Sequence, residues 1–314
     1  ILDIPNLCND EKLEPTSACR MCLVEIEGAE RPLPSCNTPA APEMVVRTKS
    51  DRLTHIRRTN LEMILSDHNA YCQPPCQIGC PTHIDIPGYL ELIAKGQNRE
   101  AARLVKEVLP FPYVLGLTCP APCQDVCRRT LVEEEIAICR MHGFAAAMCL
   151  EDPPTPWVQE APTGKKIAIV GAGPCGLTAA YYLALQGHYC KVYDMMPQAG
   201  GMLRYGIPEY RLEKDRMDME FDGVWALGVD KQYNVKLGVD FTIDDLFAEG
   251  FDAVYLAIGA WTSNELGLEH QDAPGVINAI SYLMDKVQGM PVPVDDTKEV
   301  VVLGGGFTTL DCTR

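Results

Sequence analysis

The chain has 314 residues, of which 47% are hydrophobic and 22% charged, so it is long enough for two or three compact domains. Its formal net charge of −16 argues against nucleic acid as a partner, because phosphate backbones are bound by clusters of Lys and Arg. The sequence has no membrane span of about eighteen apolar residues and no signal peptide, which favours a cytoplasmic protein.

Cysteine is the most informative residue type. Eleven of the fifteen cysteines lie in the first 139 residues, mostly in tight spacings, whereas Cys149, Cys175, Cys190 and Cys312 are scattered. Clustered cysteines in a large chain without an export signal indicate metal rather than disulfides. We read Cys175 and Cys190 as packing residues, not as a redox pair.

Residues 1–50 are turn-rich and contain the first cysteine set, with the spacing C-x10-C-x2-C-x13-C. Four soft thiolates are the ligands that a [2Fe–2S] cluster requires. Structural zinc is the alternative, but zinc sites favour two C-x2-4-C pairs and this set has one. The candidate ligands are Cys8, Cys19, Cys22 and Cys36.

The spacing, with Leu23-Val-Glu-Ile-Glu-Gly after the central pair and Pro34-Ser-Cys36-Asn-Thr-Pro beyond it, resembles the ferredoxin-like domain of the large electron-input subunit of complex I and of iron hydrogenases. The resemblance implies a β-rich [2Fe–2S] head. The first strands of that domain would lie upstream of Ile1, so we expect a longer polypeptide.

Residues 51–150 change in character, since apolar spacings of three and four around 90–94 and 101–109 predict helices. This segment contains the second cysteine set. Two C-x3-C-x3-C runs, the first followed by Pro81, suggest two [4Fe–4S] clusters with interleaved ligands. The cysteines are Cys72, Cys76, Cys80, Cys119, Cys123, Cys127 and the isolated Cys139.

Cys76-Gln-Ile-Gly-Cys80-Pro-Thr-His and Thr118-Cys-Pro-Ala-Pro-Cys resemble the helical domain of the glutamate synthase small subunit. That domain recurs in dihydropyrimidine dehydrogenase and in the large subunit of ferredoxin-dependent transhydrogenases. The resemblance implies two [4Fe–4S] clusters between an FAD domain and an outside partner. It assigns Cys72, Cys76 and Cys127 to one cluster, and Cys80, Cys119 and Cys123 to the other.

The sequence departs from this family at two ligand positions. The family's cysteine just before Cys72 is absent, and His68 stands four residues before Cys72, as a cluster-ligating histidine does in the complex I subunit. We therefore expect His68 to replace the thiolate; the alternative is an exposed histidine and a lost cluster. For the other cluster, alignment on Phe144 favours His142 as fourth ligand, softness favours Cys139, and a buried helix cysteine is the third reading.

A proline-rich linker, Glu151-Asp-Pro-Pro-Thr-Pro-Trp, marks a domain boundary, after which strand, glycine turn, helix and strand alternate. The G-x-G-x-x-G turn follows a buried strand, so Gly171 permits the tight turn, Gly173 a close approach to pyrophosphate, and Gly176 close packing. Pro174 lies inside this turn. Asp194 ends the next strand, where it suits ribose hydroxyls.

The following segment, Ala199-Gly-Gly-Met-Leu-Arg-Tyr-Gly-Ile-Pro, resembles the flavin motif of the glutamate synthase small-subunit family, and 251–260 resembles the strand that re-enters its FAD domain. The resemblance runs from about residue 70 to the end. It implies FAD, and it adds the binding residues Gly201, Met202, Arg204 and Gly259.

Residues 299–303 predict a second strand, followed by a glycine turn with Gly304 and Gly306. In the family this opens the nested NAD(P)H domain, although Asn usually stands where Phe307 does. The residues that distinguish NAD from NADP would follow beyond Arg314, so the sequence leaves that choice open.

We expect a multidomain fold: a [2Fe–2S] head (1–50), a helical double [4Fe–4S] domain (51–150), and α/β doubly wound FAD (160–298) and NAD(P) (299–314) domains. The cofactors are FAD, [2Fe–2S], two [4Fe–4S] and NAD(P)H, and no acid–base catalyst stands out. The expected function is electron transfer with other redox subunits, ferredoxin among the candidate partners. The complex would be a bifurcating transhydrogenase, a hydrogenase or a formate dehydrogenase. The alternatives are a glutamate synthase small subunit, whose usual form lacks the [2Fe–2S] head, and a non-catalytic relay.

Overall fold

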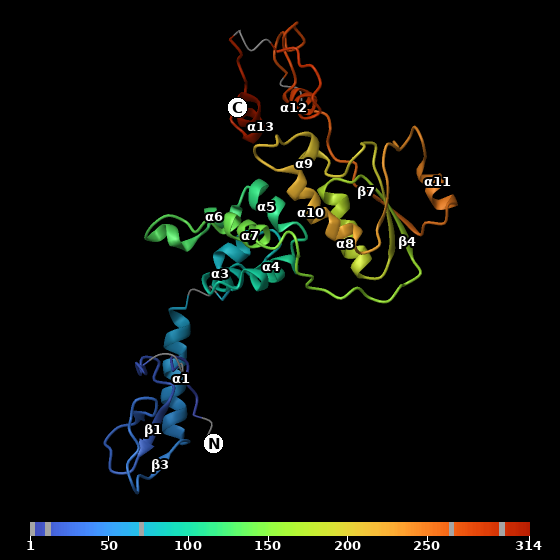
Figure 1. The fold of residues 1–314 in the computed structure, drawn as a ribbon. Helices are drawn as coiled ribbons and strands as arrows, with labels where there is room; N and C mark the ends of the chain where they lie inside the picture. The colour runs from blue at the N-terminus through green and yellow to red at the C-terminus, as the bar shows by residue number, and fades with distance from the viewer. Residues whose placement is uncertain (1–3, 10–13, 69–71, 264–266, 295–298) are drawn as a thin grey trace. The chain divides into compact units, whose positions relative to one another are not determined.

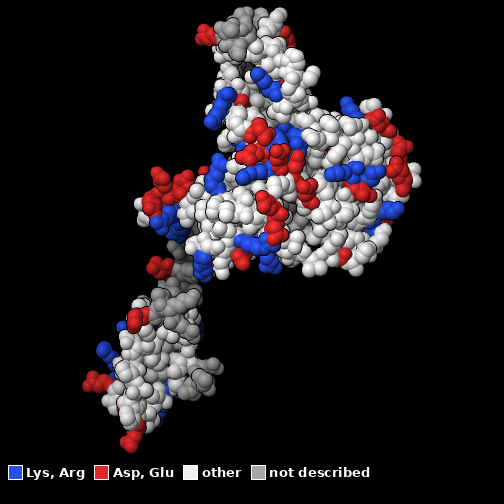
Figure 2. All heavy atoms as spheres, in the orientation of Figure 1, with Lys and Arg blue, Asp and Glu red and all other residues white. Residues whose placement is uncertain are grey.

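The computed structural model describes residues 4–9, 14–68, 72–263, 267–294 and 299–314. The chain divides into two compact units, Ile1–Cys72 and Gln73–Arg314, and each is described by itself (Figure 1). On the face shown in Figure 2, acidic and basic side chains are interspersed. No helix of the described residues is both long and apolar enough to cross a membrane.

The first unit is a small antiparallel sheet with one helix against it. The central strand β1 pairs with both neighbours, in the order β2-β1-β3, and Met21 to Val24 are buried. Helix α1 follows, and the Ser50 hydroxyl accepts a hydrogen bond from the Leu53 amide at its start. The elements are β1 Leu23–Ile26, β2 Leu33–Pro34, β3 Val46–Arg47 and α1 Asp51–Ser66.

Helix α1 belongs to this first unit by its contacts. Arg57 donates a hydrogen bond of 2.6 Å to the Leu23 carbonyl, and Asn60 donates one of 3.3 Å to the Arg20 carbonyl. Leu53 is completely buried. The compact unit therefore extends to Cys72, and the domain boundary expected at residue 50 stays a prediction.

The second unit opens with short helices around their own core, and it confirms the expected helices near 90–94 and 101–109. Ile86, Tyr89, Val105 and Ile138 are almost fully buried there. The elements are α2 Pro75–Gly79, α3 Ile86–Ala94, α4 Asn98–Lys106, α5 Pro112–Thr118, α6 Pro122–Asp125, the 3-10 helix Arg128–Leu131 and α7 Ile138–Ala147.

The α/β part follows the linker and contains a four-stranded parallel sheet in the order β6-β5-β4-β7. Alternate residues of β4 face opposite sides. Ile169 packs with α8 and α10, whereas Ala168 packs with Leu246 of α11. Helices therefore cover both faces of the sheet (Figure 1), which confirms the doubly wound α/β class. The elements are β4 Lys166–Val170, α8 Pro174–Leu185, β5 Tyr189–Tyr193, α9 Met202–Tyr205, α10 Lys214–Trp225, β6 Asp230–Gln232, α11 Ile243–Ala248 and β7 Ala253–Leu256.

The expected strand over 299–303 does not form. Val300, Val301 and Leu303 are 54%, 78% and 67% exposed, and within the described residues no strand lies beside them. A strand needs a hydrogen-bonding neighbour, so this apolar run stays extended and unpaired. The glycine turn and the helix after it do form, with Gly304 at φ +131 and α13 over Phe307–Thr313, beside α12 (Ala279–Val287).

Candidate functional site: a dinucleotide cavity and clustered thiols

A cavity of about 480 Å³ lies at the carboxyl ends of β4, β5 and β7 and at the start of α8. In open α/β sheets, ligands bind at this edge. The predicted residues Gly171, Gly173, Pro174, Asp194, Gly201, Met202 and Gly259 line it. The sequence reasoning missed Cys175, Tyr193, Met195, Val235, Lys236, Leu237, Ile258, Trp261 and Thr262. Most of these follow a strand of the sheet, which was the signal available in the sequence.

The glycine turn is shaped by close backbone contacts. Gly171 has φ +114, and a Cβ atom there would lie 2.1 Å from the Ala257 carbonyl oxygen at the end of β7. A Cβ on Gly176 would lie 1.9 Å from the Gly171 carbonyl oxygen, so α8 can approach β4 only with glycine at 176. The structural roles expected for these two glycines therefore hold.

Gly173 and Gly201 form the floor of the cavity. A Cβ on Gly201 would lie 2.9 Å from the Gly173 Cα, whereas a Cβ on Gly173 would meet only the Gly201 Cα, at 3.8 Å. Gly173 caps α8, and no side chain hydrogen-bonds the amides of this helix start. Free amides at a helix start suit a pyrophosphate. The cradle therefore fits a dinucleotide.

Asp194 stands at the end of β5 and is 7% exposed. Its carboxylate accepts hydrogen bonds from the Ala172 amide (2.6 Å) and the Met196 amide (2.7 Å). One carboxylate thus ties the glycine turn to the loop after β5, while the residue also lines the cavity.

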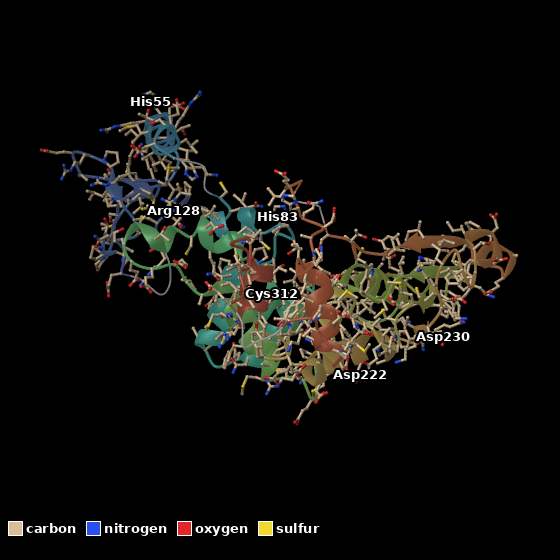
Figure 3. The ribbon with its side chains drawn as sticks, turned by 90° about the horizontal axis from the view of Figure 1, so that it is seen from above. His55, His83, Arg128, Asp222, Asp230 and Cys312 are labelled. Atoms are coloured by element: carbon tan, nitrogen blue, oxygen red, sulfur yellow. The ribbon has the colours of Figure 1, made fainter. Side chains whose placement is uncertain are left out.

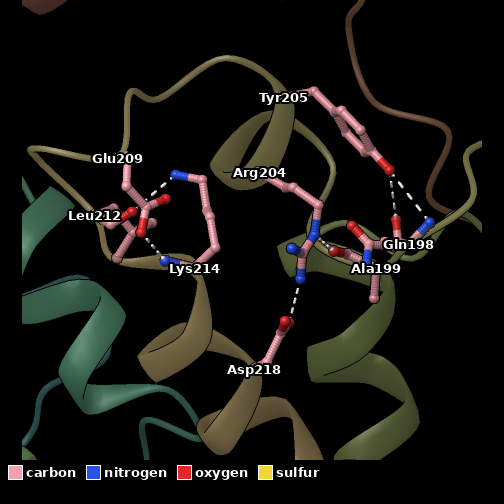
Figure 4. Close-up of polar contacts among 8 residues, drawn as sticks. All are labelled: Gln198, Ala199, Arg204, Tyr205, Glu209, Leu212, Lys214 and Asp218. Atoms are coloured by element: carbon pink, nitrogen blue, oxygen red, sulfur yellow. Dashed lines mark hydrogen bonds and ion pairs between the residues drawn. The ribbon is translucent and has the colours of Figure 1, made fainter. Parts of the chain in front are cut away.

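Arg204, expected to bind cofactor, is turned into the protein and is not among the residues that line the cavity. Its Nε donates a hydrogen bond of 2.5 Å to the Ala199 carbonyl, and its guanidinium pairs with Asp218 of α10 (Figure 4). Arg204 therefore anchors the Gly200–Gly201 turn from behind. Nearby, Lys214 donates to the carbonyls of Ile207 and Leu212, and burial lowers its pKa to about 8.

Four thiols of the second unit lie near Tyr89 of α3. Burial raises the pKa of Tyr89, and the charges of Cys123, Cys139, Cys76 and Cys80 add to this effect. Within the described residues, no three Cys, His, Asp or Glu side chains converge tightly enough to hold a metal ion. The donor chemistry nevertheless fits iron–sulfur clusters, since soft thiols share one neighbourhood on short helices.

Cys123 interacts with both Cys80 and Cys119, the two cysteines expected to share its cluster. The pKa of Cys123 rises to about 11, chiefly through burial and then through the charges of Cys80 and Cys119. Cys139 joins this group: its thiol donates to the Leu115 carbonyl (3.3 Å), and a hydrogen bond with Cys139 lowers the pKa of Cys119 to about 6.

His142, the alternative fourth ligand, faces elsewhere. Its Nδ1 lies 3.1 Å from the Pro112 carbonyl oxygen, and its ring meets Tyr89 edge-on, with 6.2 Å between centroids. Burial lowers the pKa of His142 to about 4, so the imidazole is neutral at pH 7. This placement favours Cys139 over His142.

The other expected ligand set is divided between the units. Cys76 interacts electrostatically with Cys127 and Cys80 in the second unit. His68 and Cys72 lie at the end of the first unit and are both exposed. The assignment of His68, Cys72, Cys76 and Cys127 to one cluster stays a prediction.

The first cysteine set lies in the loops around β1 and β2. The Cys19 amide donates to the Cys8 sulfur at 3.5 Å, and this contact is the main reason that the pKa of Cys8 falls to about 7. Cys22 is 3% exposed, and the Cys36 sulfur lies 3.5 Å from the Ser17 hydroxyl. A lowered thiol pKa and amide donors suit a thiolate-bound metal centre.

The second glycine turn is connected to the flavin-motif segment. Asp311 of α13 forms an ion pair with Arg211 at 2.5 Å and accepts a hydrogen bond from the Tyr210 hydroxyl at 3.4 Å. The Arg211 guanidinium lies 5.2 Å from the centre of the Phe307 ring. Gly304 and Gly306 shape this turn, and their binding role stays a prediction.

Comparison with protein families matches three models in succession along the chain. Residues 2–51 match a 2Fe-2S iron–sulfur cluster binding domain. Residues 61–153 match dihydropyrimidine dehydrogenase domain II, 4Fe-4S cluster, and residues 165–314 match pyridine nucleotide-disulphide oxidoreductase. The expected order of domains is thereby confirmed, and FAD and NAD(P)H are the cofactors of the third domain.

Curated relatives agree with these domain matches. The NADPH-Fe(3+) oxidoreductase subunit beta of Geobacter sulfurreducens is 37% identical over 269 residues, covering 83% of this chain and 39% of the relative. The NADP(+)-dependent formate dehydrogenase subunit beta of Moorella thermoacetica is 35% identical (79% and 38%). The glutamate synthase [NADPH] small chain of Escherichia coli is 35% identical (77% and 53%). The chain thus spans between about two fifths and about half of the length of these relatives.

Proposed function

We propose that this chain, which is similar to the glutamate synthase small chain and to a 2Fe-2S cluster binding domain, belongs to a protein that transfers electrons between NAD(P)H, FAD and iron–sulfur clusters. The observation that carries the proposal is one compact unit that contains both a dinucleotide cavity and six closely spaced cysteines, Cys76, Cys80, Cys119, Cys123, Cys127 and Cys139. A flavin next to one-electron carriers is the arrangement needed to convert a two-electron donor into single electrons.

When bound, NAD(P)H and FAD would supply hydride transfer, and FAD with the iron–sulfur clusters would supply single-electron transfer. The chain's own residues bind and orient. The turn from Gly171 to Gly176 would hold the pyrophosphate, Asp194 would be available to the ribose, and Arg204 fixes the Gly200–Gly201 turn from behind.

We assign the iron–sulfur ligands as follows. The [2Fe–2S] cluster takes its thiolates from Cys8, Cys19, Cys22 and Cys36. One [4Fe–4S] cluster takes His68, Cys72, Cys76 and Cys127, and the other takes Cys80, Cys119, Cys123 and Cys139. The contacts of Cys139 with Cys119 support the last choice over His142.

The donor we propose is NADPH, since the three relatives described above carry NADPH or NADP(+) in their names. The partners are other redox subunits of a cytoplasmic complex, because two of these relatives are named as beta subunits and one as a small chain. A formate dehydrogenase, a hydrogenase or a bifurcating transhydrogenase, with ferredoxin as a candidate partner, fits this role.

Anaerobic mixing of the purified full-length protein with NADPH or NADH tests the proposal. Bleaching of the flavin absorbance by NADPH, faster than by NADH, is the expected result. If neither NADPH nor NADH reduces the flavin of a flavin-loaded preparation, the proposal is contradicted and a non-catalytic relay is favoured. Co-purification with a glutamine-hydrolysing subunit would instead favour a glutamate synthase small subunit, to which the 35% identity with the E. coli small chain also points.

A further inference from the structure

Helix α5 begins with amides that its own sequence leaves without a cap. Pro112 has no N–H, and the residue before it supplies no side-chain cap. The two free amides, those of Tyr113 and Val114, donate to the two carboxylate oxygens of Glu220 at 2.7 and 2.9 Å. Glu220 belongs to α10 of the α/β part, 107 residues further along the chain, and is 8% exposed.

Neighbouring residues of α10 hold the same end of α5. The rings of Phe221 and Phe111 meet edge-to-face with 5.2 Å between centroids, and Phe221 is 1% exposed. The Arg216 guanidinium lies 5.8 Å from the centre of the Tyr113 ring. The start of α5 is therefore fixed by α10 through hydrogen bonds and ring contacts together.

The opposite side of α10 supports the dinucleotide cavity. Asp218 pairs with Arg204, which holds the Ala199 carbonyl (Figure 4). The Met217 methyl group packs against Gly200, where a Cβ would lie 3.1 Å away. Glu220 thus lies on the same helix as Met217 and Asp218, the residues that support the Gly200–Gly201 turn.

The far end of α5 leads to the cluster cysteines. Cys119 is the C-cap of α5, and its amide donates to the Leu115 carbonyl at 2.9 Å. The helix cannot shift easily against α7, because a Cβ on Gly116 would lie 2.4 Å from the Gly143 Cα. A displacement of the start of α5 would therefore move Cys119, and α7 with it.

We propose that Glu220 is a positioning residue that fixes the separation between the flavin site and the cluster of Cys119. This inference rests on the proposed function. The rate of electron tunnelling falls steeply with distance, so a carboxylate that holds both amides of α5 against α10 keeps the transfer distance constant. Because other residues of the same helix, Met217 and Asp218, support the Gly200–Gly201 turn, one element contacts both ends of the path.

The variants that test this are Glu220→Gln, which keeps one amide acceptor, and Glu220→Ala, which keeps none. Asp222→Asn is the matched control, since Asp222 is an exposed carboxylate of the same helix (Figure 3). The first readout is amide hydrogen exchange of the full-length holoprotein in segment 112–118. The second is the rate of cluster reduction, followed by EPR, after the flavin has been reduced by light without any nicotinamide.

We expect exchange in 112–118 to accelerate roughly tenfold or more in E220Q, and further in E220A, with segment 174–185 unchanged. Cluster reduction should slow several-fold, because the rate of electron tunnelling falls steeply as the transfer distance grows. The control should match the wild type in both measurements. If E220A does not fold, E220Q alone decides.

Unchanged exchange in E220Q would overturn the proposal, and so would faster exchange with cluster reduction at the wild-type rate. The proposed function fails separately, if the wild-type flavin is not reduced by NADPH or NADH. Photoreduction bypasses that step, so the two failures are distinguishable.

Discussion

Gly176 and Gly171 meet where β4 passes into α8, without space for a methyl group between them. We expect Gly176→Ala to lower the free energy of unfolding by about 1–3 kcal/mol, because the new Cβ would overlap the Gly171 carbonyl oxygen. The flavin content of the purified protein should fall as well, since the turn that carries the helix amides would have to open. Chemical denaturation and flavin absorbance measure the two effects.

Gly223 provides the control. It lies inside α10, and a Cβ there would meet no atom within 4 Å. Gly223→Ala should therefore raise the free energy of unfolding by about 0.5–1 kcal/mol and leave the flavin in place. Equal effects of the two substitutions would contradict the assignment of Gly176 to the packing of the dinucleotide turn.

Cys139 and His142 lie one helical turn apart on α7 but face different groups. Cys139→Ser should lower the iron content by about four atoms per chain, because one [4Fe–4S] cluster would lose a thiolate. His142→Gln should keep that iron, since the His142 ring faces the Pro112 carbonyl. Iron analysis with EPR decides: loss of iron in H142Q and not in C139S would reverse the assignment.

His68 tests the remaining cluster. A neutral imidazole in place of a thiolate makes a cluster less negative and raises its potential, so His68→Ala should change or abolish one four-iron EPR signal. His55, in the middle of α1, offers His55→Ala as a control. An unchanged, all-cysteine type of spectrum in H68A would show that His68 is not a ligand.

Local motifs made most individual site residues predictable. Asp194 and the glycine turn that starts at Gly171 both line the cavity and were predicted, because each motif acts over a few neighbouring residues, whereas the cysteine ligands stay a prediction. Arg204 was expected at the cofactor but anchors the turn from behind, because its orientation depends on Asp218 of another helix. Trp261 and Lys236 were missed, since their place at the cavity depends on strand order and not on any motif.

At the scale of elements, the junction of α5 and α10 predicts a pH dependence. Burial raises the pKa of Glu220 from its ordinary value of 4.5 to about 7, against the opposing effects of the two amide bonds and Lys106. The folded state thus favours the protonated carboxyl. This stabilisation is complete below about pH 4.5 and is lost as pH rises through about 7.

Relative to Glu220→Gln, the wild type should therefore lose about 3 kcal/mol of stability between those pH values, at about 1.36 kcal/mol per pKa unit. Thermal midpoints of both proteins from about pH 5 to about pH 8 measure the difference. A difference that stays constant with pH would mean that Glu220 does not titrate in this range.

Local sequence patterns predicted which segments form helices and strands, but not which other elements these segments pair or pack with. The helices near 90–94 and 101–109 and the strand before the first glycine turn agree with the sequence pattern. The run 299–303 has the same apolar pattern as β4 but forms no strand, because pairing requires a neighbour that local sequence does not specify. Glu220 and Tyr113 of α5 are 107 residues apart in the sequence, so no local motif predicts their contact.

At the scale of the whole molecule, the order of domains was predictable because cysteine spacing and glycine turns differ between the segments. The three family matches follow the expected order of [2Fe–2S], [4Fe–4S] and nucleotide domains. The extent of the first compact unit was not predictable. Helix α1 is held by hydrogen bonds to the backbone carbonyls of Leu23 and Arg20, and backbone groups carry no sequence signal.

The central claim is that electrons from nicotinamide reach iron–sulfur clusters through this chain. Its most direct test is EPR of the anaerobically purified full-length protein after NADPH, with iron, sulfide and flavin measured per chain. We predict about ten irons, about one FAD, and a two-iron signal beside four-iron signals that appear on adding NADPH. Zinc in place of iron, or clusters that dithionite reduces and NADPH leaves oxidised, would contradict the account.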